Sequence, residues 1–194
     1  MSTPVTHPPV RDSASPTGDL AGDLAGDLTG DAAELRRWRE VAGSVPDPEI
    51  PVLTLHDLGI LRGVRVRGDG TVEVTLTPTY TGCPATAVIA ADVETALRAA
   101  GVERLAVHTV LAPAWTTDWM SEQGRRKLRE YGIAPPGARR PTPSGRGIGL
   151  TLSARCPRCG STTTREISRF GSTPCKSLWS CLSCAEPFDS FKAI

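Results

Sequence analysis

Cys156-Pro157-Arg158-Cys159 and Cys181-Leu182-Ser183-Cys184 are the two stretches that decide how the C-terminal part of this chain folds. A Cys-x-x-Cys turn lets two thiolates point the same way across a tight loop, and Gly160 directly after the first pair suits such a turn. The pairs are separated by 21 residues, which is typical of a zinc ribbon, where two knuckles from two hairpins share one tetrahedral metal ion. Four thiolates would complete a closed structural site with no position open for a substrate.

The same four cysteines could instead form two disulfides or stay as free thiols, and iron could replace zinc. Disulfides are disfavoured because the N-terminal sequence has no basic region followed by an apolar one, so we expect no signal peptide and a reducing cytoplasm. Five of the six cysteines lie between residues 156 and 184, which again indicates a metal module. A net charge of +1 and the lack of a membrane-length apolar run predict neither nucleic acid nor a membrane as partner.

The composition divides the 194 residues into four parts. Residues 1–30 carry several prolines and a repeated Gly-Asp-Leu, which predicts a disordered acidic tail, with a docking segment as the alternative. Residues 134–149 hold four prolines, four glycines and three arginines without periodicity, which predicts a linker. We therefore expect one α/β domain over residues 31–133 and a zinc ribbon over residues 150–194.

Hydrophobic periodicity predicts three helices and three strands in the first domain. The helices should cover residues 31–42, 84–100 and about 118–131. A hairpin turning at Gly68-Asp69-Gly70 should join two strands that alternate apolar with polar residues, one face buried and the other wet, and residues 104–111 alternate again. The expected fold class is α+β: a three-stranded sheet with packed helices, followed by the ribbon.

Two cysteines lie outside the predicted zinc set. Cys83 sits on a Gly-Cys-Pro turn where a helix should begin, and the dipole and N–H groups of a helix N-terminus stabilise a thiolate there. A buried structural cysteine is the alternative, and no acid/base partner can be assigned to Cys83. Cys175 lies shortly before the last cysteine pair and could be a spare ligand, a redox partner or a packed side chain; we expect packing.

The segment Asp47-Pro48-Glu49-Ile50-Pro51 displays two carboxylates from a stiff loop, because each proline fixes its own φ angle and keeps the preceding residue extended. The carboxylates could be a general acid/base pair. A rigid turn whose carboxylates cap nearby N–H groups explains the same spacing, and we favour that interpretation.

Residues 45–133 resemble the small α/β domain shared by SufT-like and eukaryotic cytosolic iron–sulfur assembly proteins. The motifs that carry this resemblance are Asp47-Pro48-Glu49-Ile50-Pro51, Leu58-Gly59-Ile60 and Thr81-Gly82-Cys83-Pro84. The whole layout looks like the PaaD family, an accessory subunit of the bacterial phenylacetyl-CoA epoxidase. That second resemblance rests on the ribbon cysteines together with Phe170-Gly171-Ser172-Thr173-Pro174-Cys175-Lys176 and Pro187-Phe188-Asp189.

The resemblance implies a non-enzymatic accessory role in phenylacetate catabolism: assembling or inserting an iron–sulfur cluster, or maturing the metal centre of the oxygenase. The cysteine of the Gly-Cys-Pro turn is the reactive position of the family, so Cys83 would handle a transient iron–sulfur cluster, with Asp47 and Glu49 shaping its surroundings. Partners would be the epoxidase components and iron–sulfur assembly proteins, in the cytoplasm. Structural zinc would be bound by Cys156, Cys159, Cys181 and Cys184.

Two other functions remain open at this point. The chain could be a stable subunit of the oxygenase that contributes structure or electron transfer. A nucleic-acid-binding ribbon is the weaker alternative, because the net charge of +3 over residues 150–194 is spread out and has few interleaved aromatic residues.

Overall fold

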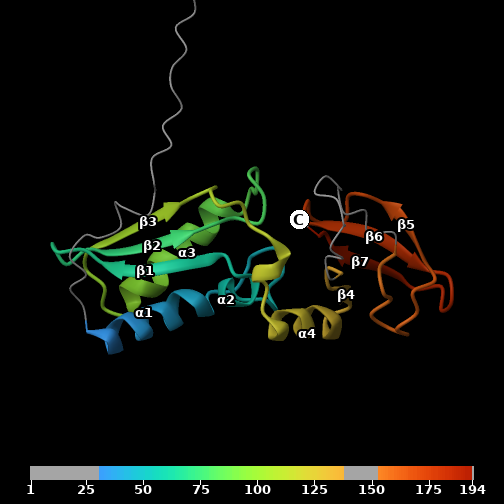
Figure 1. Ribbon diagram of the computed structural model, residues 1–194, viewed down its shortest axis with the longest axis horizontal. Coiled ribbons are helices and arrows are strands. Elements are labelled where there is room, and N and C mark those ends of the chain that lie inside the picture. The colour runs from blue at the N-terminus through green and yellow to red at the C-terminus, as the bar shows by residue number, and fades with distance from the viewer. Residues whose placement is uncertain (1–30, 138–152, 194) are drawn as a thin grey trace, which may run out of the picture.

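The computed structural model describes residues 31–137 and 153–193. The expected tail, and most of the expected linker, lie outside these residues. The described residues form two sheets, each with its own hydrophobic cluster, and Figure 1 shows the two sheets lying end to end with α4 beneath their junction. The predicted fold class, a mixed α+β unit followed by a zinc ribbon, is confirmed.

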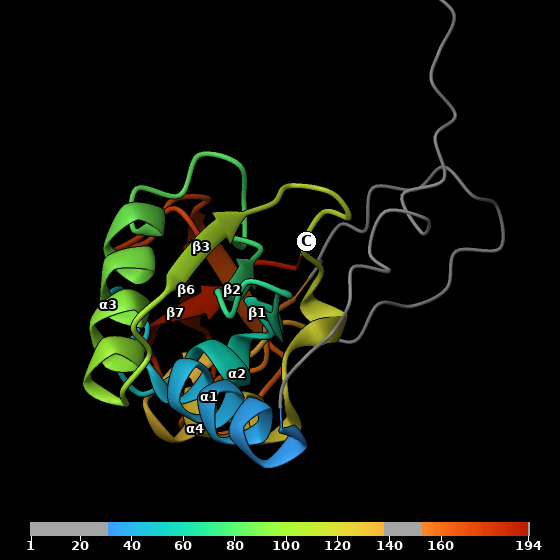
Figure 2. The same ribbon diagram turned by 90° about the vertical axis from the view of Figure 1, so that its left-hand side faces the viewer.

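The first unit is a three-stranded sheet covered by helices. Its elements are α1 (Ala32–Ser44), α2 (Leu55–Leu58), β1 (Leu61–Val66), β2 (Val72–Leu76), α3 (Thr86–Ala99) and β3 (Leu105–Thr109). The strand order is β1-β2-β3, with an antiparallel β1–β2 hairpin and a parallel β2–β3 pair connected through α3. Helices α1 and α3 contact each other and the sheet, an arrangement visible end-on in Figure 2. The helical spacing correctly places Ile89, Val93 and Leu97 in the core.

Three local expectations for this unit are wrong. The helix predicted from Pro84 begins at Thr86, because Pro84 belongs to the preceding turn. The single helix predicted over 118–131 is a short 3₁₀ helix η1 (Thr117–Trp119) followed by α4 (Glu122–Glu130). The break occurs because the Ser121 hydroxyl caps α4 by accepting a hydrogen bond from Gly124 N at 2.9 Å.

The third correction concerns the face of the sheet that was expected to be exposed to solvent. Glu73 on β2 is only 5% exposed. Arg65 on the neighbouring strand β1 and Arg67 just after it lie across Glu73, and their guanidinium nitrogens reach its carboxylate at 2.5 and 3.3 Å. These long side chains cover Glu73, which sequence alternation alone does not reveal.

The ribbon is a four-stranded sheet to which the first unit contributes a strand. Strands β4 (Ile133–Ala134), β5 (Thr164–Ser168), β6 (Lys176–Cys181) and β7 (Pro187–Phe191) follow the order β4-β7-β6-β5. Ile133 and Ala134 pair in parallel with Asp189 and Ser190 of β7. The expected boundary between residues 133 and 134 therefore falls inside a strand.

Side chains of the ribbon also enter the core of the first unit. Cys175 and Phe191 are 5% and 2% exposed and belong to the same hydrophobic cluster as the helices and sheet of that unit. The rings of Trp115 and Phe191 lie 6.1 Å apart, centroid to centroid. The two units therefore share a packed interface.

No helix among residues 31–137 and 153–193 combines the length and hydropathy needed to cross a bilayer.

Candidate functional site

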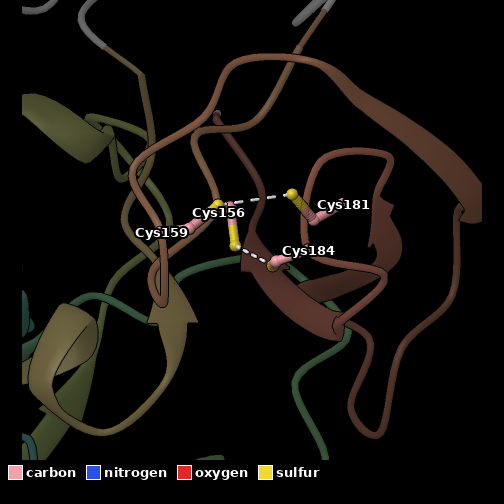
Figure 3. A group of neighbouring side chains, drawn as sticks. All are labelled: Cys156, Cys159, Cys181 and Cys184. Carbon is pink, nitrogen blue, oxygen red and sulfur yellow. Dashed lines mark hydrogen bonds between the residues drawn. The ribbon is translucent and has the colours of Figure 1, made fainter.

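The four ribbon cysteines converge on one point (Figure 3). Cys156 Sγ lies 3.8 Å from Cys184 Sγ, and Cys159 Sγ lies 3.5 Å from Cys181 Sγ. A disulfide would require about 2.05 Å. A tetrahedral ion with metal–sulfur bonds of about 2.3 Å would hold its sulfurs about 3.8 Å apart, which these distances match. The four cysteines thus converge as a closed set of four sulfurs that could hold one metal ion.

The backbone of both knuckles supports this arrangement. Gly160 and Ala185, each directly after the second cysteine of a pair, adopt the left-handed conformation with φ of 76° and 61°. The Cys184 backbone N–H, together with that of Ser183, lowers the pKa of Cys181 to about 6. Amide groups aimed at a sulfur favour the thiolate, which is the form that binds metal.

A second cluster forms where the ribbon meets the first unit. A small cavity there has a volume of about 10 Å³, room for about one water molecule. It brings together Asp47, Glu49 and Cys83, the residues that the family resemblance assigns to the site. The other residues that line it include Ile50, Leu58, Ile60, Pro78, Thr79, Ile89, Cys175 and Phe191.

Asp47 stabilises the loop that carries Glu49. Its Oδ1 accepts hydrogen bonds from Glu49 N at 2.9 Å and Ile50 N at 2.8 Å, which is the capping role that the turn interpretation expected. Burial raises the pKa of Asp47, although these two N–H groups and the nearby Lys176 ammonium oppose the rise. The side chain therefore holds the loop in shape instead of projecting freely as a base.

Cys83 lies on the turn before α3 and is half-buried. Cys83 O accepts hydrogen bonds from Thr86 N at 3.3 Å and Thr86 Oγ1 at 2.9 Å, which fixes the turn onto the helix. At Gly82, an added Cβ would meet nothing closer than the Tyr80 ring at 3.9 Å. The space beside Gly82 on this turn is thus open.

Tyr80 adds a buried polar group beside this cysteine. Its hydroxyl oxygen is buried, and no oxygen or nitrogen of the described residues hydrogen-bonds to it. Burial raises the pKa of Tyr80 above its ordinary value, and the charge and hydrogen bonding of the nearby Cys83 sulfur raise it further. Tyr80 and Cys83 are therefore close enough to interact directly.

Cys175, for which the sequence predicted packing, also belongs to this cluster, and the sequence did not place it there. It is packed, as expected, but its Sγ lies 3.7 Å from Glu49 Oε2 and 3.0 Å from Thr173 Oγ1. Burial raises the pKa of Cys175 to about 11, and the Glu49 carboxylate adds to the rise. The feature of the sequence that points to Cys175 is that it is a fifth cysteine beyond the four ribbon ligands, in the segment Gly-Ser-Thr-Pro-Cys-Lys.

Two family models match the chain, one in each unit. Residues 39–111 match the model described as "Iron-sulfur cluster assembly protein", and residues 140–192 match "PaaD zinc beta ribbon domain". The chain is 40% identical over 86 residues to "Fe-S protein maturation auxiliary factor" of Porphyromonas gingivalis, covering 44% of this chain and 81% of that protein. A solved DUF59 domain from Bacillus anthracis matches with a TM-score of 0.46 and 26% identity, covering 50% of this chain and 92% of that one.

One relative spans both units. The chain is 49% identical over 152 residues to a protein of Escherichia coli (strain K12) named as a putative subunit of 1,2-phenylacetyl-CoA epoxidase, covering 77% of this chain and 87% of that protein. Both sets of motifs, the site around Cys83 and the four-cysteine ribbon, occur here in one chain. It follows that this protein belongs to the PaaD family, in which an iron–sulfur cluster assembly domain is joined to a zinc ribbon.

Proposed function

We propose that this protein is a non-enzymatic maturation factor for a phenylacetyl-CoA epoxidase, and that Cys83 binds the iron or iron–sulfur cluster it delivers. One observation carries the proposal. A half-buried thiol on a turn lines a cavity together with Asp47 and Glu49, and the Tyr80 hydroxyl lies close to that thiol. The relatives named as Fe-S maturation factor and as putative epoxidase subunit connect that site to iron and to this oxygenase.

The chemistry of the site suits a cargo that is held and then released. Thiolate sulfur is the natural ligand of iron–sulfur clusters. Glu49 supplies a negative charge that favours cationic iron, and the loop held by Asp47 positions it. A protein that supplied all ligands in a tight site would retain its metal, whereas a partly exposed cysteine can pass it to an acceptor.

In this proposal zinc is the resident ion of the ribbon and has a structural role. Its four positions are filled by Cys156, Cys159, Cys181 and Cys184, so none remains for a substrate. Zinc is redox-inactive, and the four thiolates stay available to it in a reducing cytoplasm.

The size of the cavity at Cys83 argues against turnover of an organic substrate there. Pockets that bind small organic molecules usually measure about 300–1,000 Å³. The cavity here measures about 10 Å³. The oxygenase chemistry would therefore take place in the partner, which receives its cluster or metal centre from this protein.

A second function is favoured by the name of the relative that spans both units, which is a putative subunit of the oxygenase. A stable subunit would co-purify with the oxygenase in fixed ratio and contribute structure or electron transfer. Stoichiometry separates the two functions, because a maturation factor is needed only while the metal centre is being built.

The test is co-expression of the epoxidase components with wild-type protein, with Cys83→Ser, or with Thr95→Ala as an exposed control on α3, the helix that follows Cys83. We expect iron and sulfide content of the components to fall sharply with Cys83→Ser alone, while the variant keeps its fold and zinc. Components loaded in the presence of wild-type protein should then turn over after it is removed. Full loading with Cys83→Ser would contradict the role of Cys83. Loss of turnover on removal would identify a stable subunit.

A further inference from the structure

Two of the cysteines meet at one cavity although they belong to different units. Cys83 is contributed by the turn before α3, and Cys175 by the loop before β6 of the ribbon. Glu49, which belongs to the first unit, also reaches the ribbon, because its Oε2 accepts a hydrogen bond from the Cys175 thiol at 3.7 Å. The cavity thus contains two sulfurs and a carboxylate that no single unit could assemble.

The loop that carries Cys175 is fixed at several points. Gly171 N donates to Lys176 O at 2.9 Å, and Lys176 N donates to Thr173 O at 3.0 Å. A Cβ at Gly171 would lie only 2.8 Å from Asp189 Oδ1 and 3.1 Å from Lys176 Cβ, so glycine is needed for this close approach. Ser172 Oγ also donates to Asp189 Oδ2 at 2.9 Å.

The residue that follows β7 holds the other side of the same loop. Lys192 N donates to Cys175 O at 2.9 Å, and Lys192 Nζ donates to Pro174 O at 2.7 Å. A cysteine at position 175 that only filled space would not need any of these contacts. Together they fix the direction in which Cys175 enters the cavity beside Cys83.

We propose that Cys175 is a second sulfur ligand for the cargo, so that Cys83, Cys175 and Glu49 form one composite site completed only when the ribbon is docked. This inference rests on the proposed function and names the ligand set. The cargo class is thiophilic iron, either as a single ferrous ion or as a small iron–sulfur cluster. Each thiol releases its proton to solvent when iron binds.

The present geometry indicates how the site would work. Among the described residues, the ribbon cysteines are the one group of three or more histidine, cysteine or carboxylate donors that converge within 4.8 Å. The donors around Cys83 are therefore more widely spaced and must move together to grip an ion. The cavity has room for about one water, so a ferrous ion fits with small shifts, while a cluster would need the ribbon to move outward.

The experiment adds ferrous iron anaerobically to the full-length, zinc-loaded protein, with and without sulfide. X-ray absorption at the iron edge counts sulfur neighbours, and alkylation with peptide mapping reports protection of each cysteine. We compare wild type with Cys175→Ser, Cys83→Ser and Thr95→Ala. The last variant is a control, because Thr95 is exposed on α3, does not line the cavity and leaves both thiols in place. Zinc content verifies that each variant retains its ribbon.

With iron alone, wild type and Thr95→Ala should show two protein sulfurs on iron and protection of both Cys83 and Cys175. Cys175→Ser should show one sulfur and bind iron at least about tenfold more weakly, since even changes outside the directly bound ligands cost about 10–100-fold. Adding sulfide identifies the cargo: bridging sulfide with iron–iron scattering indicates a cluster, and its absence indicates a single ion.

Unchanged iron binding and sulfur count in Cys175→Ser, with loss in Cys83→Ser, would overturn the composite site and leave the proposed function standing. No loss in either variant would overturn both. A Cys83–Cys175 disulfide found by non-reducing mass spectrometry, without iron protection in the reduced protein, would also overturn it.

Discussion

The protein has two cysteine clusters, and they differ in how their ligands are supplied. The ribbon site takes all four sulfurs from residues 156–184, and these converge within 4.8 Å. The cavity at the interface takes Glu49, Cys83 and Cys175 from three distant segments, and its donors are spread around the cavity wall. A compact four-thiolate set suits an ion that stays. A loose set from two units suits one that is passed on.

Loss of a ribbon ligand should have the largest effect, and it should break both sites. Structural zinc contributes about 10–16 kcal/mol of apparent binding energy in small modules. Cys159→Ala should therefore lose zinc and unfold β5, β6 and β7, which removes Cys175 from the cavity. Metal analysis and hydrogen exchange should show protection retained in α1, α3 and the first sheet. Retained zinc and a protected ribbon would show that this site is not what holds the ribbon together.

Phe191→Ala tests the interface between the two sites. The ring is 2% exposed and lies against Trp115, and removing a buried phenylalanine costs about 3–5 kcal/mol. We expect that loss in denaturant unfolding, with zinc content unchanged. The matched control is Phe170→Ala, because Phe170 lies on the same ribbon and is 74% exposed; it should change stability by less than about 1 kcal/mol. Equal effects of the two substitutions would argue against a packed interface.

Asp57 offers a way to weaken the first unit alone. Burial opposes its ionisation, but Lys127, whose Nζ lies 2.6 Å away, the Thr54 N–H and the Ser121 hydroxyl hold its pKa below the ordinary value. A lowered carboxyl pKa gives stability that is present above the unfolded-state pKa of about 3.9 and is lost as the pH falls through the folded-state pKa. Asp57→Asn should cost about 1–3 kcal/mol at pH 7.

Unfolding of Asp57→Asn and wild type should be followed from neutral to acidic pH. The difference between them should shrink once the pH drops below about 4, and zinc stoichiometry at neutral pH should not change. A difference that stays constant into strong acid would mean that the carboxylate charge is not the source of the stability.

The smallest expected effect is on Glu49 and Asp47. Glu49→Gln and Asp47→Asn keep the shape of the loop, so stability should change by about 1 kcal/mol or less. With either variant, iron loading of the partner should fall by about tenfold, which is a smaller loss than with Cys83→Ser, because both sulfur ligands remain in place. Cluster content of the co-expressed oxygenase measures this. A loss as complete as that of Cys83→Ser would show that the carboxylate is as important for iron loading as the thiol.

The parts of the structure that sequence predicted are those governed by local spacing. The two Cys-x-x-Cys motifs predict the ribbon, because the geometry of each knuckle is set within about five residues. The core of α3 follows from the helical period of Ile89, Val93 and Leu97. The broken helix before α4 was missed because Ser121 N also donates to Asp57 O at 2.8 Å, a contact from a distant segment.

The composite cavity was beyond sequence reasoning for a similar reason. Nothing near Cys175 indicates that it will meet Cys83, since their approach depends on docking of the ribbon. The strand β4 was hidden too: Ile133 and Ala134 are too short a run to predict a strand, and they become one only by pairing with β7. Family resemblance assigned Cys83, Asp47 and Glu49, and tertiary packing added Cys175.

The pairing of β4 with β7 also has a consequence during synthesis. On the ribosome, Cys83 and β4 emerge well before Cys175 and β7, and N-terminal domains generally fold first. A nascent chain therefore presents Cys83 alone. In the proposed composite site, the second thiol arrives only after the ribbon has been translated and has acquired its ion. An unfinished or zinc-starved chain would then offer a single sulfur and hold iron more weakly than the finished protein.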